Sequence, residues 1–145
     1  MALTIGSDLS RRHAEDIINS RNLELVDEIY AQDAVFNDAL APGGAARGRQ
    51  EIKAFFSAVL HAMPDLHYTI EDTFGTGDRG VWRGTVRATL QGSFGPLPAT
   101  GKSATVPIAE VLRISGAQIA EVWVYFDTLS AMQQFGIIPV SGAGS

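Results

Sequence analysis

The fold of this chain is decided by the stretch from Thr105 to Gly136, which reads TVPIAEVLRISGAQIAEVWVYFDTLSAMQQFG. Its first ten residues and the segment from Ile119 to Phe126 are rich in β-branched and aromatic residues, as strands are. Ser115-Gly116-Ala117 supplies a turn between them. Asp127 then begins a short amphipathic helix, which Gly136 ends. The stretch therefore predicts a long antiparallel hairpin and a closing helix.

The preceding chain predicts further helices and strands. Apolar residues at helical spacing predict a helix over Gly48 to Ala62. Apolar and polar residues alternate from Leu66 onward, which predicts two more strands before the hairpin. We also expect two short helices in the first thirty residues, the first capped by Ser7 or Asp8, and a short strand over Ala34–Asp38.

This order of elements predicts an α+β fold. The N-terminal helices must cover one face of a curved antiparallel sheet, which gives a cone-shaped roll with a tapered cavity between the two layers. With 145 residues the chain is long enough for one domain, so we expect residues 1–145 to form a single domain. Residues 140–145 are expected to fray.

Composition excludes several classes of function. The net charge is −5 with only two lysines, Lys53 and Lys102, which argues against nucleic acid as a partner. There are no cysteines, so disulfides, thiolate metal sites and a Cys nucleophile are excluded. No run approaches membrane-spanning length, and the N-terminus lacks the apolar segment of a signal peptide. We expect a cytoplasmic protein with no membrane partner.

Glu110 is the first candidate for chemistry because it lies in the middle of an apolar strand. A carboxyl group in such a row is costly unless it is hydrogen-bonded, paired or protonated. Glu110 is therefore either a buried acid with a raised pKa, which donates a hydrogen bond or shuttles a proton, or an outer-face residue paired with Arg83 or Arg87.

Asp38 and Asp127 each follow a predicted strand. Asp38 stands just before a Pro/Gly-rich loop, where it is either a general base at the mouth of the cavity or a turn-initiating residue. Asp127 is placed to cap the closing helix. The three histidines show no ligand spacing, and no phosphate loop, nucleophile elbow or dinucleotide fingerprint is present. We therefore expect no metal and no cofactor.

The run at residues 63–136 resembles the SnoaL-like polyketide cyclase family, part of the nuclear transport factor 2-like superfamily with ketosteroid isomerase and limonene epoxide hydrolase. The similarity covers nearly the whole chain, from Arg11 to Gly136. The resemblance rests on the PATGK turn at residues 98–102, the W-x-x-x-D pattern from Trp123 to Asp127 and the QQ-x-G ending at Gly136. It implies the cone-shaped roll of that superfamily and a small-molecule enzyme that needs no cofactor.

Carried over by position, the resemblance assigns roles unevenly. Asp38 matches the general base of ketosteroid isomerase, and Glu110 matches its protonated oxyanion-hole carboxyl. Ala14 stands where the isomerase has its oxyanion tyrosine, and Val124 stands where the cyclases have a catalytic Asp. The Arg-x-Asp and Tyr-x-Asn pairs of the epoxide hydrolases have no counterpart, because Val86-Arg87-Ala88 and Phe36-Asn37-Asp38 stand there. The implied substrate-binding residues are Phe36, Asn37, Trp82, Val86, Val124 and Phe126.

Two functions follow from these observations. The first is proton abstraction next to a carbonyl in an apolar or polyketide-like substrate, with Asp38 as base and a neutral Glu110 as donor to the enolate, leading to aldol cyclisation or double-bond isomerisation. The second is a non-catalytic pocket that binds or carries a small ligand, because each relative's constellation is incomplete here.

The last strand also predicts self-association. Alternation places Ile119, Glu121, Trp123 and Tyr125 on the face away from the cavity. A monomer would expose these aromatic side chains, and such patches usually mark interfaces. We therefore expect a homodimer packed through the outer face of the sheet.

Overall fold

The computed structural model describes residues 4–140, so the tail expected to fray lies almost entirely outside the described residues. The helices are α1 (Ile5–Arg11), η1 (Arg12–Asn19, a π-helix), η2 (Leu23–Leu25), α2 (Val26–Ile29), η3 (Pro42–Gly44), α3 (Gly48–Ala62) and α4 (Thr128–Gln134). The strands are β1 (Tyr30–Asn37), β2 (Ala45–Arg47), β3 (His67–Thr76), β4 (Arg79–Thr89), β5 (Ser103–Ser115) and β6 (Gln118–Phe126). None of the described helices is long and apolar enough to cross a membrane.

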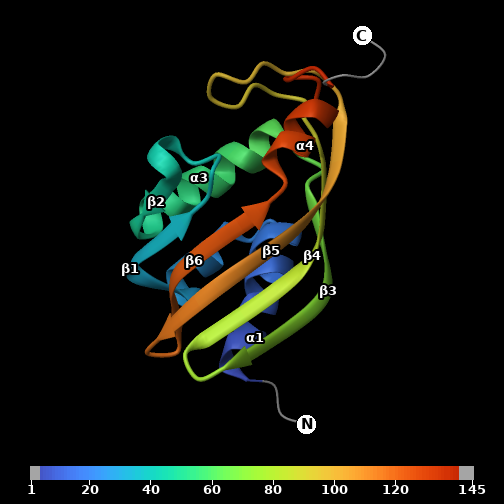
Figure 1. Cartoon of the computed structure of the whole chain (residues 1–145). Coiled ribbons are helices and arrows are strands. Elements are labelled where there is room, and N and C mark those ends of the chain that lie inside the picture. Colours follow the sequence, from blue (N-terminus) through green and yellow to red (C-terminus); the bar gives the residue numbers. More distant parts are fainter. Residues whose placement is uncertain (1–3, 141–145) are drawn as a thin grey trace.

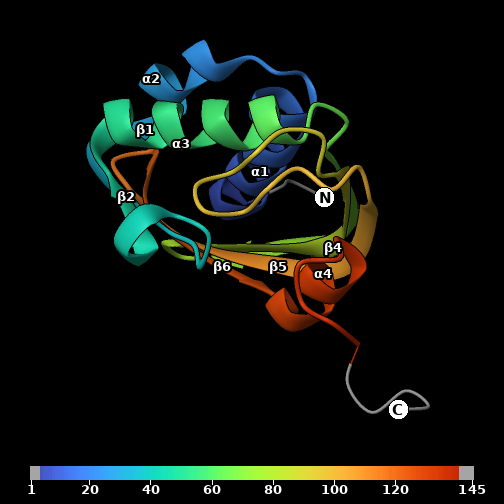
Figure 2. The same ribbon diagram turned by 90° about the horizontal axis from the view of Figure 1, so that it is seen from above.

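The six strands form one curved sheet in the order β2-β1-β6-β5-β4-β3. Strands β3 to β6 make the expected antiparallel meander, whereas β1 pairs with β6 in parallel, so the sheet is mixed. Helices α1, α2 and α3 all lie on the same side of the sheet (Figure 1, Figure 2). The α+β roll predicted from the order of elements is confirmed.

The hairpin of β5 and β6 closes through Gly116 and Ala117, both at positive φ, 57° and 63°. Two central residues with positive φ match the twist of the flanking strands, which is why a glycine stands in this turn. Helix α4 begins as expected, because the Asp127 side chain accepts a hydrogen bond from the Ser130 amide at 2.9 Å. Helix α3 has the predicted bounds.

Local details at the N-terminus differ from the sequence expectations. The first helix is capped by Thr4, whose hydroxyl accepts from the Ser7 amide, and neither Ser7 nor Asp8 is the cap. Strand β1 begins four residues earlier than expected, at Tyr30. The start of α1 packs directly on the β3–β4 hairpin because Gly6 and Gly80 lack side chains: a Cβ on either would collide with the other segment's backbone. This close contact shuts one end of the roll.

Two bulges change which side chains face the helices. An extra residue at Glu71 in β3 and another at Ala120 in β6 interrupt the ladder. Each bulge reverses the alternation beyond it. Ile119 is therefore fully buried rather than on the outer face, while Phe74 points outward and is 54% exposed.

Candidate active site

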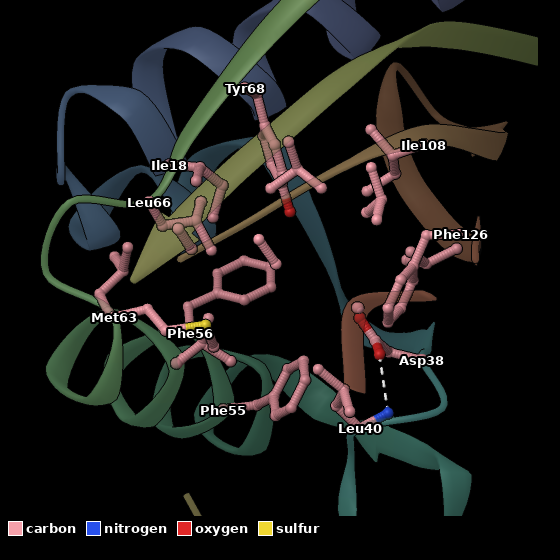
Figure 3. A pocket seen from close by; sticks show the side chains of 18 of the residues that line it. Ile18, Asp38, Leu40, Phe55, Phe56, Met63, Leu66, Tyr68, Ile108 and Phe126 are labelled. Carbon is pink, nitrogen blue, oxygen red and sulfur yellow. Dashed lines mark hydrogen bonds between the residues drawn. The ribbon is translucent and has the colours of Figure 1, made fainter. Parts of the chain in front are cut away.

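A cavity of about 80 Å³ lies between the concave face of the sheet and helices η1 and α3. Its walls are apolar side chains from β4, β5 and β6 on one side and from α3 on the other, among them Val86, Ile108, Phe126, Phe55 and Phe56 (Figure 3). Two of the side chains that line it carry oxygen, those of Asp38 and Tyr68. Any polar chemistry in this cavity therefore depends on a carboxyl and a phenol.

Asp38 directly follows β1 and opens the turn toward β2. Its Oδ1 accepts a hydrogen bond from the Leu40 amide at 2.8 Å (Figure 3), and its carbonyl accepts from the Ala41 amide at 3.0 Å. Asp38 is thus a turn residue, as one of the two sequence interpretations proposed, and it also lines the cavity. The backbone turn fixes where the carboxyl points.

The surroundings of Asp38 suit a base that works near neutral pH. Burial raises the pKa of Asp38 from its ordinary value of 3.8 to about 6. The hydrogen bond from the Leu40 amide lowers this pKa, and the Glu110 carboxyl raises it by a smaller amount than burial does. A general base is most effective when its pKa lies near the working pH. At pH 7 this carboxyl is largely ionised and is still a stronger base than an ordinary aspartate.

Tyr68 lies on β3, and its hydroxyl extends into the cavity (Figure 3). Its backbone is held on both sides by Asn19 of η1, whose amide group donates to the Tyr68 carbonyl at 2.8 Å and whose Oδ1 accepts from the Tyr68 amide at 2.9 Å. The ring packs on Trp82 with centroids 4.9 Å apart. Within residues 4–140 the hydroxyl makes no hydrogen bond, so it is free to donate to a ligand.

Burial is the largest effect that raises the pKa of Tyr68 well above its ordinary value, and the Glu110 and Asp38 carboxyls raise it further. The phenol therefore stays protonated at physiological pH and can act only as a neutral hydrogen-bond donor or acceptor. Such a donor stabilises an oxyanion that forms within its reach. Sequence analysis missed this residue, although the alternation in β3 places Tyr68 on the apolar face with Leu66 and Ile70.

Glu110 does not line the cavity, although its cross-strand neighbour Val124 does. It is fully buried between Trp82, which donates from Nε1 to Oε1 at 3.0 Å, and His13, whose Nε2 is 2.8 Å from the same oxygen. The alternative pairing with Arg83 or Arg87 is wrong, because Arg83 contacts Glu71 and Asp72 while Arg87 contacts Asp65, all on the exposed side. Glu110 belongs to the core.

A chain of polar groups extends behind Glu110. The Tyr30 hydroxyl is 2.9 Å from His13 Nδ1, so His13 joins Tyr30 on one side to Glu110 on the other. The His13 ring is not aligned for a good hydrogen bond to Glu110, and Glu110 Oε2 has no partner among the described residues. The signal for His13 in the sequence is its place four residues from both Leu9 and Ile17 on the buried face of the first helices.

The structure brings together only part of the predicted site. Phe36, Asp38, Val86, Val124 and Phe126 line the cavity. Asn37, Trp82 and Glu110 do not line it. Asn37 points the other way, because strand alternation reverses its side chain relative to Phe36, and it donates to Glu121 Oε2 and to the Val122 carbonyl, both at 3.0 Å. Trp82 is fully buried beside Glu110, its cross-strand neighbour.

No cluster of three or more metal-ligating side chains occurs in the described part of the chain. Ala14, at the position of the isomerase tyrosine, is fully buried against Trp82 and Ile108. Val124, at the position of the cyclase acid, faces the cavity without a polar group. The two oxygens of Asp38 and the Tyr68 hydroxyl are therefore what this cavity offers a substrate.

Known structures share this architecture. TsrD from Streptomyces laurentii superposes with a TM-score of 0.80 at 20% identity, over 95% of this chain and 99% of that chain. IdmH from Streptomyces antibioticus, described as a candidate polyketide cyclase, has a TM-score of 0.71 at 28% identity, over 90% and 98% of the two chains. AclR from Streptomyces galilaeus, described as a candidate hydroxylase, has a TM-score of 0.70 at 22% identity, over 86% and 81%.

No curated protein sequence gave a significant match. The SnoaL-like polyketide cyclase family matches residues 8–135, which is most of the chain and includes every residue of the cavity. This protein therefore belongs to the SnoaL-like polyketide cyclase family.

Proposed function

We propose that this protein is a cofactor-independent enzyme that removes a proton next to a carbonyl of an apolar, polyketide-like substrate. The observation that carries this proposal is the pairing of a half-buried carboxylate of raised pKa, Asp38, with a neutral phenol, Tyr68, in an otherwise apolar cavity. A base and an oxyanion donor are the two groups that enolisation requires.

Each group has a defined part in the reaction. The Asp38 carboxylate takes the α-proton, and the electrons of the broken C–H bond form the C=C bond of the enolate. Negative charge moves to the carbonyl oxygen, where the Tyr68 hydroxyl donates a hydrogen bond. The apolar walls strengthen that hydrogen bond by excluding water.

Two outcomes follow from the same enolate. In an aldol cyclisation the enolate carbon attacks a second carbonyl of the same molecule, and the new alkoxide takes the proton back from Asp38. In a double-bond isomerisation Asp38 returns the proton to a different carbon. Both outcomes conserve the proton and need no oxidant, reductant or metal.

Tyr68 replaces Glu110 in this proposal. The sequence assigned the donor role to Glu110, but that side chain does not line the cavity, whereas its cross-strand neighbour Val124 does. We propose that Glu110 acts from outside the cavity. It accepts the hydrogen bond that holds Trp82 in place, and the Tyr68 ring packs on Trp82. Its effect on catalysis is then indirect, through the position of Tyr68.

Deuterium exchange tests the proposal with 2-tetralone, a ketone whose α-protons are acidified by the adjacent ring. We expect catalysed exchange in deuterated buffer by NMR, and about a hundred- to ten-thousand-fold less in Asp38→Asn, with binding retained. Asp127→Asn serves as the control because that carboxyl caps α4 outside the cavity. Equal loss of binding and exchange in Asp38→Asn would favour the ligand-binding alternative, which the apolar Val124 supports.

We also propose that the protein is a homodimer through the outer face of the sheet. Phe74, Val81, Val111 and Trp123 are cross-strand neighbours in one row over four strands, and Tyr125 beside them is 60% exposed. Ion pairs such as Arg83–Glu71 and Arg113–Glu121 flank this row. An apolar centre with a charged border is typical of protein interfaces.

A further inference from the structure

A second and larger hollow lies outside the cavity. It has a volume of about 840 Å³ and is bounded by the turn after β1, one side of α3 and the loop between β4 and β5. We call this hollow the outer groove. The small side chains of Ala54 and Ala58 on α3 leave space for the outer groove, and Phe94 and Leu97 of the loop form its opposite wall. A bridge between Phe94 and Leu97 orders that loop, with both amide-to-carbonyl distances at 2.9 Å.

The outer groove adjoins the cavity. Leu40 and Phe55 line both hollows, so these two side chains form the partition between them. Asp38 lies at this partition, because its carboxylate is hydrogen-bonded to the Leu40 amide (Figure 3). The proposed base therefore stands where the two hollows meet rather than at the blind end of the cavity.

The sizes of the two hollows differ too much for the cavity to hold a large substrate alone. A cavity of about 150 Å³ in a protein core is known to accept benzene, and the cavity here is about 80 Å³. The outer groove falls within the range of about 300–1,000 Å³ that ligand pockets occupy. Only the reacting end of a substrate fits inside, and the remainder must lie in the outer groove.

The lining of the outer groove indicates the chemistry of that remainder. No Lys or Arg lines either hollow, so an anionic ligand would have no cationic partner. The Phe94 ring stands near Phe55, with centroids 6.2 Å apart and the rings steeply inclined, and both present aromatic surface to the groove. Aromatic walls of this kind suit a flat, uncharged ring system. Glu51, His61 and Ser93 supply polar groups for hydroxyl or carbonyl substituents.

We propose that the outer groove is a second binding subsite, which holds the non-reacting rings of an uncharged, flat, multi-ring ketone. Its reacting carbonyl end passes between Leu40 and Phe55 to reach Asp38 and Tyr68. This inference rests on the proposed function for the identity of the reacting end. Leu40, Phe55 and Ala58 are then the residues that determine substrate length.

Affinities for a graded series of ketones test the subsite. The probes are acetophenone, 2-acetylnaphthalene and 2-acetylanthracene, with one, two and three rings, and the measurement is the dissociation constant by isothermal titration calorimetry. We expect affinity to rise about tenfold with each added ring, the gain for burying roughly 60 Å² of apolar surface. Ala58→Phe fills the outer groove and should remove the gain that the second and third rings give.

Ser57→Phe is the matched control, because Ser57 is an exposed neighbour on the same helix that does not line the groove. Ala54→Leu is a second, milder groove variant for the case that Ala58→Phe folds poorly. A wild-type protein that binds all three ketones alike, or a groove variant that keeps the gain, would overturn the inference. A changed sedimentation coefficient in Ala58→Phe would also overturn it, since the groove would then be an interface with a second copy.

The proposed function and this inference can be refuted independently of each other. Affinity alone decides the subsite, whereas deuterium exchange into the methyl group of each ketone decides the chemistry. Graded affinity without exchange would preserve the subsite and remove the enzyme; exchange without graded affinity would do the reverse.

Discussion

Asp38→Asn should make the protein more stable while it removes activity. The folded-state pKa of about 6 lies above the ordinary value of 3.8, so burial favours the protonated form. Wild-type stability is then highest below the unfolded pKa and falls as the pH rises from about 4 to about 6. Asparagine keeps the hydrogen bond from Leu40 but carries no charge, so it avoids this loss.

The expected gain can be worked out from the two pKa values. The interval from 3.8 to about 6, at about 1.36 kcal/mol for each pH unit, corresponds to about 3 kcal/mol once Asp38 is fully ionised. The advantage of Asp38→Asn should therefore be about 1 kcal/mol near pH 4.5, about 1.5 kcal/mol near pH 5 and about 3 kcal/mol at pH 8. The difference between the two proteins isolates Asp38, because every other titrating group is common to both.

Urea unfolding of both proteins across this pH range, followed by tryptophan fluorescence, measures the difference. Asp127→Asn is the control: asparagine caps a helix about as well as aspartate, so the two should differ by less than about 0.5 kcal/mol at all pH values. If Asp38→Asn gains less than about 0.5 kcal/mol at pH 8, the carboxyl is not held in an apolar environment. The reasoning about its pKa and its role as base would then be refuted.

Three further predictions concern Tyr68, Glu110 and the sheet. Tyr68→Phe should lower the exchange rate about a hundred- to a thousand-fold with unchanged urea stability, because the hydroxyl would act only on the enolate; an unchanged rate would remove it from the site. Glu110→Gln should cost less than about 1 kcal/mol, whereas Glu110→Leu should cost about 1–3 kcal/mol in urea unfolding by leaving the buried Trp82 N–H unpaired; a more stable Leu variant would contradict the core assignment. Trp123→Glu should convert the proposed homodimer to a monomer in sedimentation at about 20 µM, and a monomeric wild type would contradict the proposed interface.

The fold was predictable because local signals and the overall pattern agree. The helical spacing in α3, the turn at Gly116 and the cap at Asp127 each specify one conformation, and together they leave one way to cover the sheet. The parallel pairing of β1 with β6 had no local signal, since it joins segments about 85 residues apart. The bulges at Glu71 and Ala120 had no local signal either, and the bulge at Ala120 accounts for the misplaced face of Ile119.

The site was only half predictable. Asp38 was accessible to sequence analysis because a strand end, a Pro/Gly loop and a family match coincide there. Glu110 was correctly recognised as an unusual acid in an apolar row. Whether its side chain lines the cavity depends on how the helices pack over the sheet, which the sequence pattern does not show. Tyr68 and His13 were missed because an aromatic residue in a strand, or a histidine on a helix face, is ordinary until its polar atoms are located. The partners of a buried polar group come from other elements, which alternation alone does not reveal.

The role of Asp38 as base is best measured by the pH dependence of deuterium exchange into 2-tetralone. The rate catalysed by the wild-type protein should rise with pH, reach half of its maximum near pH 6 and stay level above it, as the Asp38 carboxylate forms. Asp38→Asn should remove this titration together with the catalysis, while Asp127→Asn retains both. A catalysed rate that keeps the same midpoint in Asp38→Asn, or a wild-type protein that binds the ketone without exchanging its protons, would contradict the account.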